Sequence, residues 1–181
     1  MQYKSGGSSV ELKQLMDSND VNRVLTRISH EILEKNQGSK GLYLVGLETG
    51  GVFLSQVIRS KITEIENEEV LIGSLDVSMY RDDLKFRPQK PKKDSNLGNI
   101  DDKIVVLVDD VLFTGRTVRA ALQALNDFGR PISVQLAIMV DRGHRELPIR
   151  PDFVGKNIPT NRYEIVVVND GGVYLGIKNN D

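Results

Sequence analysis

The stretch Lys103–Leu122, KIVVLVDDVLFTGRTVRAAL, constrains the fold of this chain more than any other. It opens with a continuous apolar run at Ile104–Val108, rich in β-branched residues, which is typical of a strand buried on both faces of a parallel sheet. Two acids, Asp109 and Asp110, end the run, and a short loop leads into apolar residues at helical spacing. The predicted order is strand, acidic pair, loop and helix, and α/β sheets of this kind bind ligands at the carboxyl ends of their strands.

The loop Thr114–Thr117, TGRT, has the composition of a site for a single phosphate group. It offers two hydroxyls, a glycine that lets the backbone approach a ligand, and the N–H groups of a helix start. Asp109 and Asp110 suit the vicinal hydroxyls of a ribose. Together these features predict a ribose 5-phosphate site, although an ordinary strand-to-helix turn with an aspartate cap has the same local pattern. A Walker-type phosphate loop is excluded, because its glycine and lysine spacing is absent.

Length and composition set limits on the rest. A chain of 181 residues is expected to form one domain that buries roughly 70% of its unfolded surface. The absence of cysteine excludes disulfides and thiolate metal sites, and it agrees with the cytoplasm as the expected location. No apolar run predicts a signal peptide or a membrane span. Because the formal net charge is −1, a basic surface for nucleic acid has to come from the arrangement of side chains rather than from excess charge.

Predicted strands and helices alternate along the chain. The alternation predicts right-handed crossovers and an α/β fold with a mainly parallel central sheet flanked by helices. We expect an N-terminal arm at residues 1–17 and one domain at residues 18–181. Its expected elements are a helix from Ser18, strands at Leu42–Leu47, Val70–Met79 and Ile132–Val140, and a final hairpin of Glu164–Val168 with Val173–Ile177.

The segment VVLVDDVLFTGRT resembles the phosphoribosyl pyrophosphate (PRPP) signature of type I phosphoribosyltransferases. From about Met16 to Glu164 the chain resembles the PyrR family, which joins pyrimidine operon regulation to uracil phosphoribosyltransferase activity. The resemblance implies the single-domain type I phosphoribosyltransferase fold, with a flexible loop at 80–100 and a small hood over the base at 141–162. It assigns PRPP and nucleotide binding to the whole signature: Val105, Val106, Leu107, Val108, Asp109, Asp110, Val111, Leu112, Phe113, Thr114, Gly115, Arg116 and Thr117.

The same resemblance assigns further roles around PRPP. Asp109, Asp110 and Arg81 are expected to be catalytic, and the loop Thr49, Gly50 and Gly51 is expected to hold pyrophosphate through its backbone. Relatives usually carry arginine in place of Gly50, so this chain lacks that guanidinium and would hold pyrophosphate through backbone donors, as the Gly-Gly loop of the purine-using relatives implies. The stretch Lys85–Lys93 has five Lys or Arg residues and no acid, and it is either a flap that closes over PRPP or a disordered loop.

Two positions favour a pyrimidine as the base. Purine-using relatives have aspartate where this chain has Phe113, and lysine where it has Asp141. Asp141, Phe153 and Val154 are expected to form the base hood. Two basic groups match the RNA-facing residues of PyrR, although a solvated charged face has the same composition: Thr26, Arg27, His30 and Lys35, then His144, Arg145, Arg150 and Lys156.

The implied reaction transfers the phosphoribosyl group from PRPP to uracil and gives UMP and pyrophosphate. Mg²⁺ is the expected cofactor, bound mainly through PRPP and not by a metal cage of the protein. With UMP or UTP as effector, the chain is expected to bind a leader mRNA hairpin and attenuate transcription, as a homodimer or homotetramer. The alternatives are a nucleotide-responsive RNA-binding regulator with weak or no catalysis and a purine salvage enzyme. Arg27→Ala or Arg145→Ala is expected to weaken RNA binding and to spare UMP synthesis.

Overall fold

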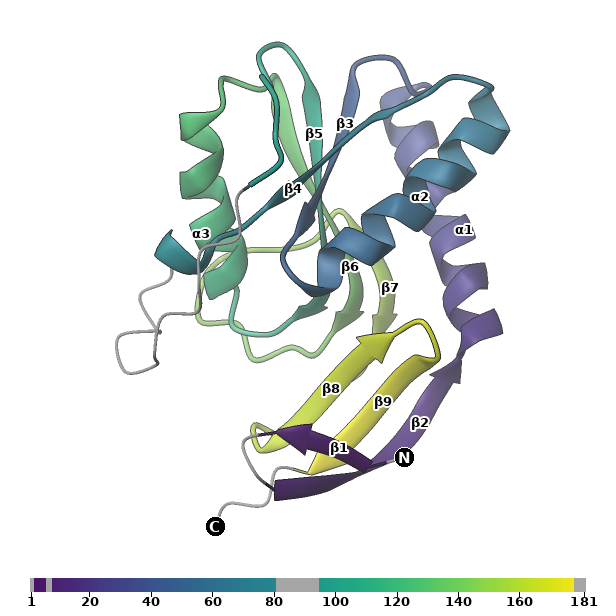
Figure 1. The fold of residues 1–181 in the computed structure, drawn as a ribbon, viewed down its shortest axis with the longest axis vertical. Coiled ribbons are helices and arrows are strands. Elements are labelled where there is room, and N and C mark those ends of the chain that lie inside the picture. The colour runs from purple at the N-terminus through teal and green to yellow at the C-terminus, as the bar shows by residue number, and fades with distance from the viewer. Residues whose placement is uncertain (1, 6–7, 81–94, 178–181) are drawn as a thin grey trace.

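The computed structural model describes residues 2–5, 8–80 and 95–177, and its centre is a five-stranded sheet (Figure 1). The strand order is β4-β3-β5-β6-β7, and every neighbouring pair is parallel. The predicted α/β fold is therefore confirmed. The strands are β3 (Leu42–Leu47), β4 (Leu71–Leu75), β5 (Ile104–Leu112), β6 (Ser133–Asp141) and β7 (Phe153–Asn157).

Helices cover both faces of this sheet. Helices α1 (Ser18–Asn36) and α2 (Gly50–Glu66) pack on one face, and α3 (Arg116–Ala124) packs on the other (Figure 1). Both faces of β5 are therefore buried, and Val105–Val108 are at most 2% exposed. This explains why the apolar run of β5 is continuous rather than alternating.

Helix α1 begins one residue after its true cap. The side chain of Asp17 accepts a hydrogen bond from Asp20 N at 2.7 Å, and the Asp20 carboxylate accepts one from Asp17 N at 3.2 Å. This reciprocal pair is a capping box, which fixes the start of the helix at Ser18, where it was expected.

A second, antiparallel sheet lies at the carboxyl end of the parallel strands (Figure 1). Its order is β1-β2-β9-β8, with β1 (Gln2–Ser5), β2 (Ser8–Asp17), β8 (Glu164–Asn169) and β9 (Gly172–Ile177). The predicted hairpin of β8 and β9 is confirmed. The described part of the N-terminal arm forms β1 and β2, which extend this sheet at its edge, and β2 pairs along β9 and buries Leu12 and Met16.

The expected hood at 141–162 also needs correction. Its centre is β7, the fifth strand of the parallel sheet, hydrogen-bonded to β6. The small sheet is built instead from the two ends of the chain, which the sequence pattern alone did not bring together.

The expected loop at 80–100 is described only in part. Arg81 and the basic flap lie outside the described residues. The end of the segment belongs to the folded body, because Asn96 forms a bridge with Ser74 and Ile100 is fully buried. Among the described residues, no helix is long and apolar enough to cross a membrane.

Candidate active site

The site lies at the carboxyl ends of β3 and β5, where the strand order of the sheet reverses. In the sheet β3 lies between β4 and β5, and the helix that follows β3 (α2) and the helix that follows β5 (α3) pack on opposite faces. Open α/β sheets bind ligands at such points. Pairing between β3 and β5 ends at Gly46 and Val108, whereas β5 stays paired with β6 to Leu112. Asp109 and Asp110 therefore lie beyond the reach of β3, at the opening between the two strands.

Asp109 is buried and Asp110 is half-buried. Asp109 is 7% exposed and its Oδ1 accepts a hydrogen bond from Asp110 N at 3.0 Å, while Asp110 Oδ1 accepts one from Val111 N at 2.7 Å. Burial raises the pKa of Asp110, and the Val111 N–H bond offsets only part of this effect. A neutral, hydroxyl-rich group such as a ribose suits this place, because it can donate hydrogen bonds to both carboxyl groups.

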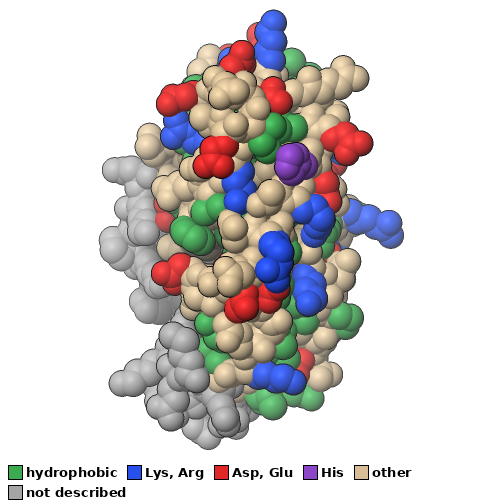
Figure 2. Space-filling view, turned by 90° about the vertical axis from the view of Figure 1, so that its right-hand side faces the viewer, with side chains coloured by type: hydrophobic (Ala, Val, Ile, Leu, Met, Phe, Trp, Pro, Cys, Tyr) green, Lys and Arg blue, Asp and Glu red, His purple; other side chains and the backbone are tan. Residues whose placement is uncertain are grey.

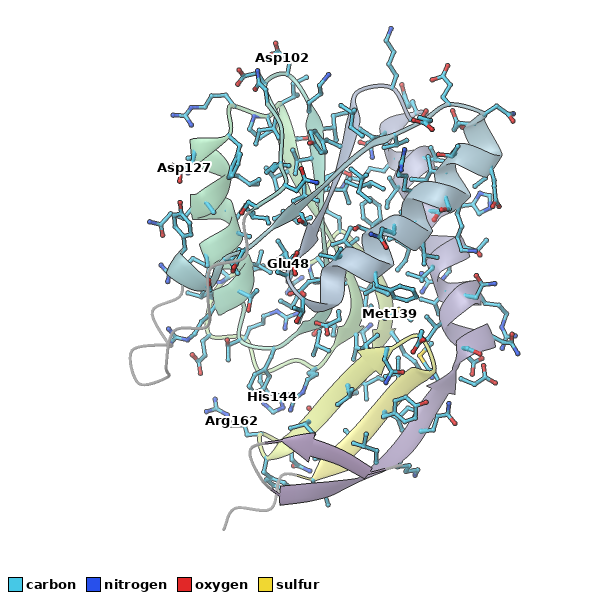
Figure 3. All side chains as sticks on the ribbon, viewed as in Figure 1. Glu48, Asp102, Asp127, Met139, His144 and Arg162 are labelled. Atoms are coloured by element: carbon cyan, nitrogen blue, oxygen red, sulfur yellow. The ribbon has the colours of Figure 1, made fainter. Side chains whose placement is uncertain are left out.

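The predicted pyrophosphate loop packs directly on this pair. A methyl group at Gly50 would lie 2.1 Å from Asp110 Oδ2, and one at Gly51 would lie 1.9 Å from the carbonyl oxygen of Val108. The preceding Glu48–Thr49 peptide bond is cis, and Figure 3 shows Glu48 near the start of α2. Both glycines are thus required by the close approach of α2 to β5, and the start of α2 faces the acidic pair.

Asp109 and the residues that follow the acidic pair, from Val111 to Val118, line a cavity of about 260 Å³. Gly115, with φ of +93°, caps α3, and a helix start at a glycine cap presents backbone N–H groups to an anion. Thr114 and Thr117 line the same cavity, which is called the phosphate cavity below after the predicted role of its TGRT loop. Arg116 donates to Glu146 Oε2 at 2.8 Å, which brings an unpredicted acid to the wall of this cavity.

Twelve of the thirteen residues of the signature divide into two groups, and Asp110, the thirteenth, lies against Gly50. Val105–Val108 are core residues of the sheet, so their predicted role in binding is wrong for the side chains, which pack on both helical layers. Asp109 and Val111–Thr117 line the cavity. The ligand-facing part of the signature therefore begins at the acids.

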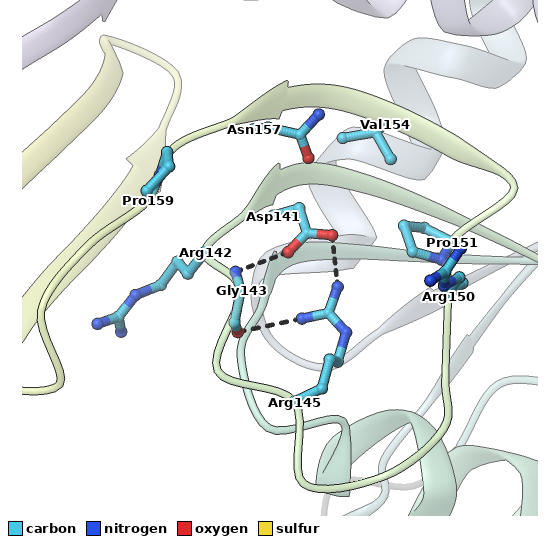
Figure 4. Close-up of a pocket in the computed structure, with 9 residues that line it drawn as sticks. All are labelled: Asp141, Arg142, Gly143, Arg145, Arg150, Pro151, Val154, Asn157 and Pro159. Carbon is cyan, nitrogen blue, oxygen red and sulfur yellow. Dashed lines mark hydrogen bonds and ion pairs between the residues drawn. The ribbon is translucent and has the colours of Figure 1, made fainter.

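A second cavity, of about 440 Å³, opens beside Asp141 at the ends of β6 and β7 (Figure 4). Asp141 Oδ1 accepts a hydrogen bond from Gly143 N at 2.8 Å, and its other oxygen accepts one from Arg145. Both oxygens of Asp141 therefore brace the loop after β6. Arginine side chains dominate the charged lining, which suits an anion: Arg142, Arg145 and Arg150.

Of the residues expected in the base hood, Phe153 does not face a cavity. Its side chain is 3% exposed and packs in the core under α1, with Lys35 Nζ 5.6 Å from its ring centroid. The side chain of Val154, the next residue in the strand, points to the opposite face of the sheet and lines the second cavity.

Folding brings α1 and β7 together, and with them several of the predicted RNA-facing residues. Arg27 donates to the carbonyl oxygens of Val154 and Gly155 at 3.0 and 2.7 Å, and Lys35 pairs with Asp152. On this face Lys and Arg side chains gather beside a histidine, with acids among them (Figure 2). The exposed members of this surface, called the α1–β7 surface below, are Arg27, His30, Lys35 and Lys156.

The remaining residues of the predicted RNA set lie differently. Thr26 is partly buried and donates to Asn22 O at 2.9 Å, and Arg150 is exposed at the second cavity. Arg145 is partly buried and also donates to Phe113 O at 2.9 Å, inside the site. Figure 3 shows His144 between the two sheets. His144 and Arg145 therefore contact the nucleotide-site residues rather than the α1–β7 surface.

Two residues at the site were not predicted from the sequence. Glu146 lines the first cavity and Arg142 is a buried cation beside Phe113. The only available signal was the density of charged residues in DRGHRE after a buried strand, which does not say which charge turns inward.

Comparisons with known proteins agree with this geometry. The model of the phosphoribosyl transferase domain matches residues 11–170. The protein named "Bifunctional protein PyrR" from Geobacter sp. (strain M21) is 58% identical over 156 residues, which cover 85% of this chain and 88% of the relative. Its counterpart from Clostridioides difficile is 56% identical over 162 residues and covers 88% and 92%. That from Streptomyces coelicolor is 52% identical over 176 residues and covers 93% and 91%.

Solved structures show the same fold at lower identity. A hypoxanthine phosphoribosyltransferase from Staphylococcus aureus has a TM-score of 0.68 at 21% identity and covers 91% of each chain. The hypoxanthine phosphoribosyl transferase of Trypanosoma cruzi has a TM-score of 0.68 at 22% identity and covers 84% of this chain and 80% of that one. These likenesses support the fold, and the PyrR relatives carry the closer relationship. The chain belongs to the PyrR family of the type I phosphoribosyltransferases.

Proposed function

We propose that the protein transfers the phosphoribosyl group of PRPP to uracil, and that with a uridine nucleotide bound it binds a leader RNA and attenuates transcription of pyrimidine genes. One observation carries the enzymatic part: the acidic pair, the two-glycine loop and the phosphate cavity meet at the opening between β3 and β5. The relatives that are 52–58% identical to this chain are named "Bifunctional protein PyrR", and this name supports the combination of two functions.

The site acts mainly by positioning the substrate. Asp109 and Asp110 accept hydrogen bonds from the ribose hydroxyls, and the TGRT segment holds the 5-phosphate. The bond between C1 of the ribose and the pyrophosphate breaks as the base nitrogen attacks, and positive charge develops on the ribose. The buried carboxyl groups favour that charge, because they act in a place with little water.

Mg²⁺ fits this site as an ion carried by the substrate. The described residues contain no group of three or more His, Asp or Glu side chains that would enclose a metal. Asp109 and Asp110 would instead hold the ribose of the substrate that carries the ion. When bound, Mg²⁺ neutralises the leaving pyrophosphate.

Uracil is the proposed base because Phe113, the residue before the TGRT loop, has an apolar side chain. Phe113 has no group that exchanges a proton with the imidazole nitrogen of a purine. Purified protein incubated with PRPP, Mg²⁺ and either uracil or hypoxanthine tests this choice. UMP formation with little IMP supports it. IMP formation without UMP would establish purine salvage instead.

The weakly catalytic alternative rests on Gly50, and the structure supplies a sharp test of it. A side chain at Gly50 would overlap that of Asp110, because its first carbon would lie 2.1 Å from Asp110 Oδ2 and 2.8 Å from Asp110 Cβ. We therefore expect Gly50→Arg and Gly50→Ala each to lower kcat/KM for PRPP by about 10-fold or more, because Asp110 has to move. Steady-state rates at varied PRPP measure this. A faster Gly50→Arg enzyme would show that the glycine weakens catalysis.

The α1–β7 surface is the proposed RNA-binding face. Its cations come from segments more than 100 positions apart and are brought together by the packing of α1 on β7. Arg150 extends the basic surface to the second cavity. Phosphate contacts of this kind give affinity that falls with salt.

Arg27→Ala is expected to reduce RNA affinity in the presence of UMP by about 10-fold and to lower the salt slope by about one, while UMP synthesis changes little. Filter binding at several salt concentrations, alongside the enzyme assay, measures both. Arg130→Ala, at an exposed position in the connection from α3 to β6, is the matched control and should alter neither. Arg145→Ala should lower both activities, because Arg145 holds Asp141 and Phe113 O.

A further inference from the structure

Four side chains from three segments meet between the two sheets. Phe113 follows β5, Arg142 and His144 follow β6, and Thr160 lies in the connection from β7 to β8. The guanidinium carbon of Arg142 is 4.2 Å from the centroid of the Phe113 ring, and the His144 ring meets the same ring at 5.4 Å and 67°. Arg142 Nε donates to Thr160 Oγ1 at 2.9 Å, and His144 Nε2 is hydrogen-bonded to Thr160 O. The two side chains that contact the phenyl ring therefore also hold Thr160.

Arg142 is the centre of this cluster. It is 8% exposed, and its hydrogen-bond acceptors are uncharged: Thr160 Oγ1, Asn161 O at 3.0 Å and Glu164 O at 2.6 Å. Burial lowers the pKa of Arg142, which reflects the cost of removing its charge from water. The gain from the arginine is geometric, because one planar group fixes three acceptors and one ring.

The parts that Arg142 connects lie on opposite sides of the nucleotide site. Phe113 lines the phosphate cavity and stands next to Thr114 in the chain. Glu164 is the first residue of β8, so the segment 160–164 carries the edge of the small sheet. The N–H of Arg142 also donates to Leu112 O at 3.0 Å, which ties its backbone to the end of β5. Arg142 thus sets the distance between the phosphate side of the site and the small sheet.

We propose that Arg142 is a positioning residue that fixes the width of the base site, by stacking on Phe113 and holding residues 160–164 above it. This rests on the proposed transfer to a base. A base joined to a ribose between Asp109, Asp110 and the phosphate cavity extends past the side chain of residue 113 toward that segment. Because Arg142 fixes Phe113 and this segment relative to each other, it would set the space left for the base, and the preference for a one-ring over a two-ring base would depend on it.

Arg142→Lys tests the proposal, because lysine keeps the charge and loses both the flat stacking face and the fork of donors. We expect KM for uracil to rise about 10- to 100-fold, with kcat and KM for PRPP changed less than about threefold, since the base site loosens while the phosphate side stays in place. The ratio of uracil to hypoxanthine turnover should fall. UMP binding measured by calorimetry should weaken in parallel.

Phe113→Leu supplies an independent arm, because it removes the ring and leaves Arg142. It should raise KM for uracil in the same way, and the double variant should be little worse than either single variant, because both remove one shared contact. Arg130→Lys is the matched control, since Arg130 is exposed and contacts Asn126 on the far side of the protein.

Three outcomes would overturn the proposal. Kinetic constants of Arg142→Lys within twofold of wild type would show that the stack positions nothing. Equal losses of kcat/KM for uracil and for PRPP, together with a fall in Tm of more than about 8 °C, would show a purely structural role. Strictly additive effects of the two substitutions would show that they act separately. If wild-type protein makes no nucleotide at all, the proposed function fails instead, and the two failures are distinguishable.

Discussion

Asp110→Asn is expected to lower phosphoribosyl transfer by about two to three orders of magnitude and, at neutral pH, to make the protein more resistant to heat. Activity falls because an amide replaces a carboxylate that accepts hydrogen bonds from the ribose as positive charge develops there. Stability rises because burial raises the pKa of Asp110, so the fold disfavours its charged form.

The sign of the stability effect follows from the direction of the pKa shift. A raised folded pKa gives stability that is fully present below the unfolded pKa of an aspartate and is lost as pH rises through the folded pKa. The neutral asparagine does not undergo this loss, and its carbonyl oxygen can still accept the Val111 N–H bond. Above that pH the variant should unfold about 2–4 °C higher, which corresponds to about 1 kcal/mol in a domain of this size.

Thermal unfolding from pH 4 to pH 8, beside the enzyme assay, measures both effects. The gap in Tm between variant and wild type should close toward acidic pH. Asp170→Asn, in the exposed turn between β8 and β9, is the control and should change neither property. A variant less stable than wild type at pH 8 would contradict the account of Asp110 as a buried acid that strains the fold.

Gly51→Ala is expected to destabilise the protein by about 3 kcal/mol or more, with a fall in Tm of roughly 6–12 °C and loss of activity. Its methyl group would lie 1.9 Å from Val108 O and 2.9 Å from Val108 C, and neither backbone atom can move without shifting β5. Helix α2 would have to retreat from the sheet, and the pyrophosphate loop would move with it.

Gly98→Ala is the matched control for this substitution. An added methyl group there meets only Tyr43 Oη, at an ordinary 3.5 Å. Thermal unfolding and UMP synthesis measured on both variants separate the close approach from a general effect of losing a glycine. Equal behaviour of the two variants would mean that α2 does not pack against β5 as closely as the structure has it.

The central element was predictable because its signals are local. The apolar run of β5, the acids, the TGRT loop and the spacing of Val118, Ala121 and Leu125 all lie within about 20 neighbouring residues, and the structure has the strand and helix where expected. The same holds for the hairpin of β8 and β9, whose turn sequence is a short-range signal.

The errors concern contacts between distant segments. Phe153 has an aromatic side chain suited to stacking, and only the pairing of β7 with β6 shows that it turns into the core. Strand β2 is held in the small sheet by backbone pairing with β9, and a polar sequence carries no pattern that indicates such pairing. Likewise the contact of Gly50 with Asp110 and the burial of Arg142 depend on helix and loop placement that no periodicity records.

The small sheet joins β2, near the start of the chain, to β9, near its end. During synthesis on the ribosome, β2 emerges first and has to wait for about 155 further residues before its partner exists, whereas the parallel sheet can assemble from neighbours in sequence. The protein should therefore fold in two stages, and a growing chain that already holds the phosphate cavity should acquire the sheet above it only when translation is nearly complete.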